Sequence, residues 1–216
     1  MKKVYIWATL LPCLAAAVLG LVMRQSYTNF TAEPDPMQHF NVALMKSDTA
    51  ASAVEFEREI LPESIAVVRV KATGRVNYLF RTYTETVIVQ EVFKGEGIRP
   101  GEQIDVEREA AMIFFETMSV NMGFVNYMQK DKEYLLFLGR KVDTLDKKET
   151  VYRLTEGIWA PIFAYDDIES VVKTPDEHNY VPYREVAGSE FFVSTPEALA
   201  ELQAFKQEVL AQYPRP

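Results

Sequence analysis

The feature that most constrains this chain is a run of twenty residues near its N-terminus, 4–23, that contains no charged side chain. As a helix this run would be about 30 Å long, which matches the hydrocarbon thickness of a bilayer. Lys2 and Lys3 precede the run and a single arginine, Arg24, follows it directly. Because positive charge is retained on the cytoplasmic side, the sequence predicts a cytoplasmic stub over 1–3, a transmembrane signal anchor over 4–23 and an extracytoplasmic remainder. The expected localisation is the cell membrane, as a single-pass protein.

Two other interpretations of the segment compete with the uncleaved anchor. A cleaved signal peptide would end at a small-x-small site, which Ala15-Ala16-Ala17 offers, but cleavage there would leave an apolar new terminus. A lipoprotein signal would need a small residue before the only cysteine, Cys13, and Pro12 occupies that position. The anchor fits best, since the apolar run continues beyond its only plausible cleavage site.

Composition after the anchor limits the chemistry of the remainder. Without Lys2 and Lys3, the chain carries 21 basic against 31 acidic residues, and it has no cysteine beyond Cys13. An acidic domain repels nucleic-acid phosphates, so no nucleic-acid partner is expected. No disulfide, thiolate metal site or cysteine nucleophile is available there, and we expect no cofactor or metal.

The remainder divides into a lead-in and one domain. Prolines 34 and 36 exclude a regular helix or central strand, so residues 24–47 are predicted to form a stalk or linker. The domain is predicted over 48–216 and starts with a helix over 48–60, which Pro62 ends.

Short strands with turn residues between them follow this helix. The strand candidates are 64–70, 78–93, 103–107, 133–138, 151–154, 157–165 and 168–172. Within 133–138, every residue after Glu133 is apolar, which is typical of a strand buried on both faces. A C-terminal amphipathic helix is predicted over 196–212, because Thr195 can cap it and Pro196 suits its first position. The pattern is mainly β with peripheral helices, an α+β class, and favours a small antiparallel barrel or sandwich.

Three stretches also resemble a pattern in exported or membrane-anchored proteins of Gram-positive bacteria. A strand ends in Lys94-Gly95, a Pro100-Gly101 turn leads into the next strand, and Lys-x-Tyr-Leu-Leu-Phe-Leu follows over 132–138. The resemblance covers residues 64–165 and implies a small OB-like barrel, similar in outline to the netrin or metalloprotease-inhibitor barrel. Inhibitors of that shape reach the metal with an N-terminal cysteine, which this domain lacks, so the resemblance carries fold and not that activity.

An aromatic and methionine-rich segment, 110–128, is the candidate interaction surface. It carries Phe114, Phe115, Phe124 and Tyr127. Aromatic and methionine side chains suit adaptable binding surfaces. The competing interpretation is a long loop that folds over the barrel as part of its core.

Carboxylates are the only abundant catalytic residue type. Glu107 and Glu109 lie on one face in strand register, and Asp166, Asp167 and Glu169 have oxygens that suit a hard cation. Edge charges and solvated turns explain the same residues. We therefore expect a membrane-anchored, extracytoplasmic binding or interaction module without catalysis, with an unidentified protein partner. The alternative is a carboxylate-based or metal-dependent cell-surface enzyme, in which these acids would meet in one concave site. Inhibition of extracellular hydrolases is a third option, by analogy of fold alone.

Overall fold

A computed structural model provides the structure of the chain. It describes residues 2–25, 36–78, 82–108, 112–114, 119–145, 149–175, 177 and 180–216, with the side chains of all but 2–9, 36 and 112–114. Two compact units are present, Met1–Pro36 and Met37–Pro216.

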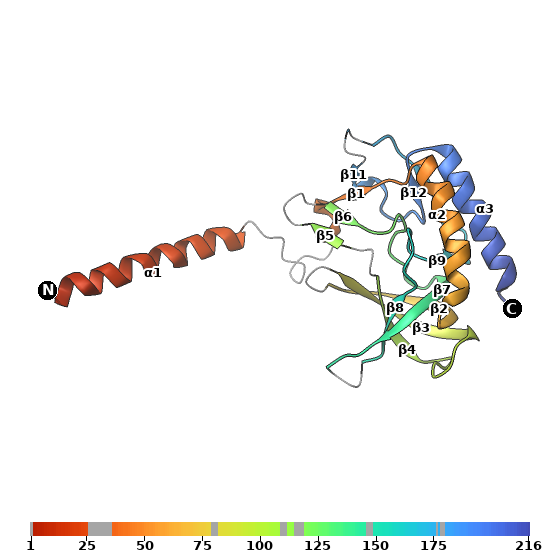
Figure 1. Ribbon diagram of the computed structural model, residues 1–216, viewed down its shortest axis with the longest axis horizontal. Coiled ribbons are helices and arrows are strands. Elements are labelled where there is room, and N and C mark those ends of the chain that lie inside the picture. The colour runs from red at the N-terminus through yellow and green to blue at the C-terminus, as the bar shows by residue number, and fades with distance from the viewer. Residues whose placement is uncertain are drawn as a thin grey trace. The chain divides into compact units, whose positions relative to one another are not determined.

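The described part of the first unit is one helix, α1 (Lys2–Gln25), together with Pro36, and the helix predicted over 4–23 lies within α1 (Figure 1). Among the residues whose side chains are described, which in α1 are 10–25, no helix is both long and apolar enough to cross a membrane.

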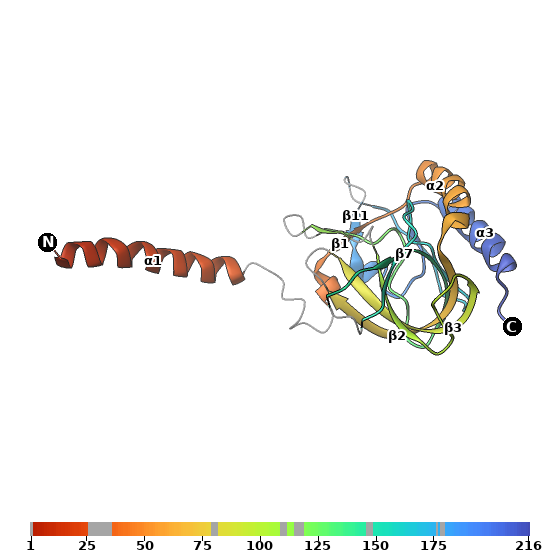
Figure 2. The same cartoon turned by 60° about the horizontal axis from the view of Figure 1, so that its bottom comes forward.

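Five strands of the second unit close into a barrel. They are β2 (Ala66–Tyr78), β3 (Tyr83–Lys94), β4 (Gln103–Glu107), β7 (Glu133–Val142) and β8 (Val151–Leu154). The hydrogen-bonded order is β2-β3-β4-β8-β7, and β7 pairs again with β2, which closes the ring (Figure 2). Strand β9 (Ile162–Ala164) pairs with the N-terminal part of β7, residues 134–136. The predicted barrel is therefore confirmed at the level of an α+β chain with a closed five-stranded barrel.

One pairing in this ring is parallel. In β4·β8, Asp105 lies opposite Val151 and Glu107 lies opposite Arg153, with both strands running the same way. The other four pairings are antiparallel. The prediction of an entirely antiparallel barrel is wrong at this point, because a closed ring with an odd number of strands cannot alternate direction throughout.

The strand sequences account for the barrel core. In β7, the apolar run from Tyr134 to Leu138 is buried throughout, as predicted for a strand enclosed on both faces. In β3, Val87 and Val89 alternate inward with period two. Of the strand candidate 157–165, only β9 is a strand.

A small second sheet contains the end of the predicted stalk. Its order is β11-β1-β6-β5, and its strands are β11 (Tyr180–Pro182), β1 (Asn41–Ala43), β6 (Ser119–Asn121) and β5 (Met112–Phe114). Met37, Phe40 and Val42 are buried here. The linker predicted over 24–47 therefore ends earlier than expected, because the apolar side chains after Pro36 join the domain core.

Shorter elements complete the second unit. They are the two-stranded pair β10 (Val171–Val172) and β12 (Phe192–Val193), and the 3-10 turns η1 (Pro36–His39), η2 (Leu61–Glu63) and η3 (Tyr183–Glu185).

Two helices, α2 (Ser47–Ile60) and α3 (Pro196–Gln212), lie side by side against the barrel in both views (Figures 1 and 2). The helices predicted over 48–60 and 196–212 are confirmed. Thr195 caps α3 as expected, since its side-chain oxygen accepts a hydrogen bond from the backbone N–H of Ala198 at 3.2 Å. Glu57 is the one charged residue on the buried face of α2, where its neighbours are apolar.

Candidate functional site

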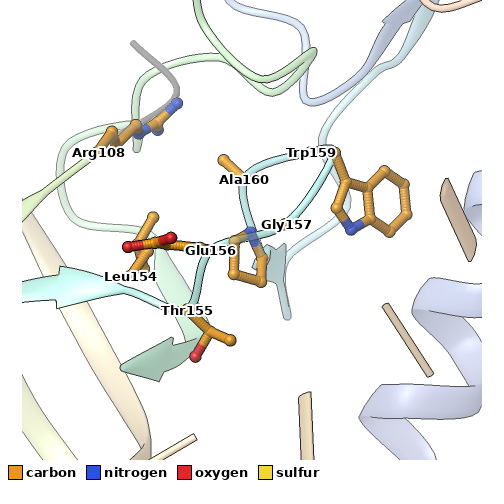
Figure 3. A pocket seen from close by; sticks show the side chains of 8 residues that line it. Arg108, Leu154, Thr155, Glu156, Gly157, Trp159 and Ala160 are labelled. Carbon is orange, nitrogen blue, oxygen red and sulfur yellow. The ribbon is translucent and has the colours of Figure 1, made fainter. Parts of the chain in front are cut away.

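A cavity of about 220 Å³ lies between the end of β4 and the loop that joins β8 to β9. It is lined by Arg108, Leu154, Thr155, Glu156, Gly157, Trp159, Ala160 and Pro161. In Figure 3, Arg108 stands across the cavity from the loop, and the side chain of Trp159 points away from it. The volume is below the roughly 300–1,000 Å³ of drug-sized sites, so the cavity suits a small ligand or a single inserted side chain.

Arg108, one residue beyond β4, is 1% exposed and provides the buried charge of this site. Its Nη1 donates to the carbonyl oxygen of Val125 at 2.7 Å, and its Nη2 donates to that of Asn126 at 2.5 Å. Nη2 also lies 2.7 Å from Oε2 of Glu85 on β3. The guanidinium therefore ties the barrel to the chain segment that covers this end of it.

Glu85 is the acidic partner inside the barrel and is 2% exposed. Its Oε1 accepts a hydrogen bond from the backbone N–H of Met128 at 2.6 Å. Burial raises the pKa of this carboxyl, while the positive charge of Arg108 opposes that rise. The pair is thus a desolvated ion pair whose partners depend on one another, because either charge alone would be buried without compensation.

Three polar atoms of this network lack a hydrogen-bond partner among the described residues: Nε of Arg108, Oε2 of Glu85 and the hydroxyl of Tyr83. The Glu85 oxygen is close to Arg108 but is not aligned for a hydrogen bond. Orphaned buried polar atoms are rare in folded proteins and often mark the place of a water molecule or a ligand. Of these residues, Arg108 is the one that borders the cavity.

Tyr127 belongs to a cluster of tyrosines around this ion pair. Its ring centroid lies 4.8 Å from that of Tyr83 and 6.1 Å from that of Tyr183, and its hydroxyl accepts a hydrogen bond from Tyr78 at 3.3 Å. Burial raises the pKa of the Tyr127 hydroxyl well above its usual value. The side chain is half-buried and turned toward other protein groups.

The rest of the predicted aromatic surface is only partly described. Phe124 is half-buried and packs against the main core, with a left-handed φ of 60°. Phe114 lies in β5, but its side chain is outside the description, and Phe115 is outside the described residues altogether. Met122 and Met128 are buried. In its described part, the segment follows the competing interpretation of a loop that packs into the core.

The acids of the enzyme hypothesis have separate partners. Oε2 of Glu107 accepts from Nη2 of Arg153 at 2.8 Å, whereas Asp166 accepts from the backbone N–H of Glu133 and from Arg215. These contacts hold the pKa of Asp166 below its usual value, with the Glu133 hydrogen bond as the largest cause.

The remaining acids add no metal site to this description. Glu169 accepts through its backbone oxygen from Glu190, and Glu109 is outside the described residues. Asp167 borders a different, polar cavity beside α3. Within the described part of the chain, no three metal-binding side chains gather around one point.

The residues that define the cavity and its ion pair were not identified from the sequence. Glu85 alternates with Val87 and Val89 on β3, so its inward orientation follows from the period of the strand. Arg108 follows directly on the alternation of β4, one residue after Glu107. The sequence signal that could have identified Glu85 and Arg108 is a charged residue at a strand position where the alternation places apolar residues in the core.

The sequence has no match among protein-family models and no significantly similar curated protein.

Proposed function

We propose that this chain is a membrane-anchored, extracytoplasmic binding module that performs no catalysis, with the cavity beside Arg108 as its binding site. The anchor would be the uncharged run 4–23 within α1, preceded by Lys2 and Lys3. The separation of the chain into two compact units, with the boundary at Pro36, agrees with an anchor that carries an independent domain.

We further propose that the barrel is of the OB type. Its first three strands form a meander, the fifth lies parallel to the third, and the fourth returns to pair with the first. Five-stranded Greek-key barrels of this kind use their surface and end loops to bind ligands. An analogy of fold supports binding in general and does not identify the ligand.

The observation that carries the proposal is the cavity itself. It combines a buried guanidinium, whose Nε has no hydrogen-bond partner among the described residues, with the exposed loop residue Glu156, which carries a carboxylate. A concave site with a few convergent polar groups is the arrangement that ligand sites share. By contrast, Glu107 and Asp166 are each engaged in an ion pair elsewhere, with Arg153 and Arg215.

Site-specific photo-crosslinking on intact cells tests the binding site. The photoreactive residue benzoylphenylalanine replaces Glu156 at the cavity rim, and in a matched control it replaces the exposed Glu59 on α2. We expect an adduct of defined mass from position 156 that is absent from position 59. The same adducts at both positions, or none at position 156, would reject the cavity as the binding site.

Membrane topology is tested by cysteine labelling in a Cys13→Ser background. One variant carries Gln103→Cys on the exposed surface of β4, and the other carries Lys2→Cys. An extracytoplasmic domain predicts that a membrane-impermeant maleimide labels position 103 on intact cells and position 2 only after permeabilisation. The reverse pattern would contradict the proposed orientation, and recovery of the chain in the soluble fraction would contradict the anchor.

A further inference from the structure

Glu57 is a buried acid on α2 that the binding proposal does not use. Its side chain is 0% exposed, and its neighbours on the same helix face are Ala50, Ala53 and Val54. Oε1 accepts a hydrogen bond from the backbone N–H of Trp159 at 3.3 Å. Oε2 has no hydrogen-bond partner among the described residues. The carboxyl group therefore joins α2 to the loop between β8 and β9.

That same loop forms a wall of the cavity. Gly157, Trp159 and Ala160 line the cavity on one side (Figure 3). On the other side, the loop is so close to Glu57 that a Cβ atom at position 157 would overlap the carboxyl oxygens. Trp159 continues the contact into the core, where its ring stacks on that of Phe191. The two ring centroids are 5.6 Å apart, and the angle between the ring planes is 9°. A change in the charge of Glu57 therefore acts on the cavity wall directly, because Glu57 contacts the backbone at Gly157 and Trp159 and both residues line the cavity.

Among the described residues, no cation forms an ion pair with the Glu57 carboxyl group. Each of the two helices has a single cation, and both are engaged with other acids: Arg58 of α2 lies 2.7 Å from Glu208, and Lys206 of α3 lies 2.6 Å from Glu190. The charged groups on the three packed elements are Asp48, Glu55, Arg58 and Glu59 of α2, Glu156 of the loop, and Glu197, Glu201, Lys206 and Glu208 of α3.

Burial is the main cause of an unusual titration at this position. It raises the pKa of Glu57 from 4.5 to about 8, and the backbone N–H groups of Trp159 and Ile158 oppose part of that rise. At neutral pH the closed structure therefore contains the neutral acid. In a Glu57 side chain released into water, the pKa would return to its ordinary value, and the carboxyl group would lose its proton at neutral pH.

We propose that Glu57 is a proton-controlled latch that holds the loop 156–160 against α2 when protonated and releases it, opening the cavity wall, when the proton is lost. The closed form binds the proton and the open form does not. Opening therefore becomes more favourable as the pH rises from the ordinary pKa of a glutamate towards the raised pKa of buried Glu57. Above the raised value both forms are ionised and the equilibrium no longer changes. The latch does not depend on what the cavity binds.

Thiol labelling of the full-length chain in detergent micelles measures this opening. Ala160, which is 4% exposed and lines the cavity, is replaced in a Cys13→Ser, Ala160→Cys chain, and the rate of reaction with a dithiodipyridine reagent is followed from pH 5 to 9. The same rate is measured with Glu57→Gln added. The rate of the chain that retains Glu57 is divided by the rate of the Glu57→Gln chain at each pH, which cancels the ionisation of the thiol. We expect this ratio to rise about tenfold per pH unit up to about pH 8 and then to level off.

Three variants give the test its specificity. Glu57→Met is a second neutral replacement if glutamine does not fold at this position. Glu59→Gln changes an exposed acid on the same helix and should leave the rate at position 160 unchanged at every pH. Ala72→Cys places the thiol in β2, at a site 3% exposed in the barrel, where only global unfolding gives access. A ratio that does not change with pH, or labelling as fast at position 72 as at position 160, would overturn the latch.

Discussion

The ion pair between Arg108 and Glu85 makes a quantitative prediction about the stability of the barrel. Glu85→Gln removes the negative charge but keeps an oxygen that can accept the N–H of Met128. The guanidinium, 1% exposed, then remains as a buried charge without its counter-ion. Breaking a buried pair in this way costs about 3–5 kcal/mol.

A control pair on the same barrel separates burial from charge. Glu107 and Arg153 form an ion pair of similar length, 2.8 Å against 2.7 Å, but their side chains are 13% and 17% exposed. Because solvent reaches this pair and screens part of its attraction, Glu107→Gln should cost less than Glu85→Gln, about 1 kcal/mol. The free energy of unfolding is measured by urea denaturation of the full-length chain in nonionic micelles. Circular dichroism and fluorescence should give the same transition.

A double variant completes the test. Arg108→Met alone loses the hydrogen bonds to Val125 and Asn126 and leaves Glu85 without its cation. Adding Glu85→Gln to Arg108→Met should recover part of the loss, since no uncompensated charge is then buried. The reasoning is refuted if Glu85→Gln costs no more than Glu107→Gln, or if the losses of Glu85→Gln and Arg108→Met simply add.

Three further predictions follow from other contacts. Burial raises the pKa of Glu57 to about 8, so the stability that the neutral acid contributes is complete below pH 4.5 and is lost as pH rises towards 8. The Glu57→Gln variant lacks this pH dependence. Between pH 5 and pH 8, its unfolding free energy should therefore gain about 4 kcal/mol relative to that of the natural chain, as measured by urea titrations. Gly95→Ala should cost about 1–3 kcal/mol by thermal or urea unfolding, since Gly95 has φ 112° and its Cβ would lie 2.6 Å from that of Ala66; unchanged stability would contradict this close approach. Thr195→Ala should cost about 1 kcal/mol through loss of the α3 cap, with exposed Ser52→Ala as a control that changes stability little.

Much of the fold could be predicted because local patterns determine it. The alternation over 103–107 gives β4 with its observed bounds, and the capping residue Thr195 with Pro196 gives the start of α3. Within 133–138, the apolar run after Glu133 predicts the buried part of β7. In each case, the side-chain period or the cap lies within a few residues, so no distant partner is needed to recognise the element.

The elements that were missed depend on distant partners. Strand β1 has three residues and pairs with β11, about 140 positions away, and its prolines upstream indicate a linker. The predicted strand 157–165 is shortened to β9 because the N–H of Trp159 bonds to the Glu57 side chain instead of a neighbouring strand. Glu85 and Arg108 meet only once β3 and β4 are paired and capped by residues 125–128. Such meetings are not encoded in any one stretch of sequence.

The closure of the ring by β2 and β7 also determines the order in which the domain can fold. Val67 pairs with Phe137, so this residue of the first barrel strand waits for seventy further residues before its second neighbour exists. Helix α2 ends at Ile60, but its packing partner α3 begins only at Pro196. During synthesis, the second edge of β2 is therefore exposed until β7 is made, and the apolar face of α2 is exposed until α3 is made. A chain cut short before α3 would leave the apolar face of α2 open to aggregation and to proteases.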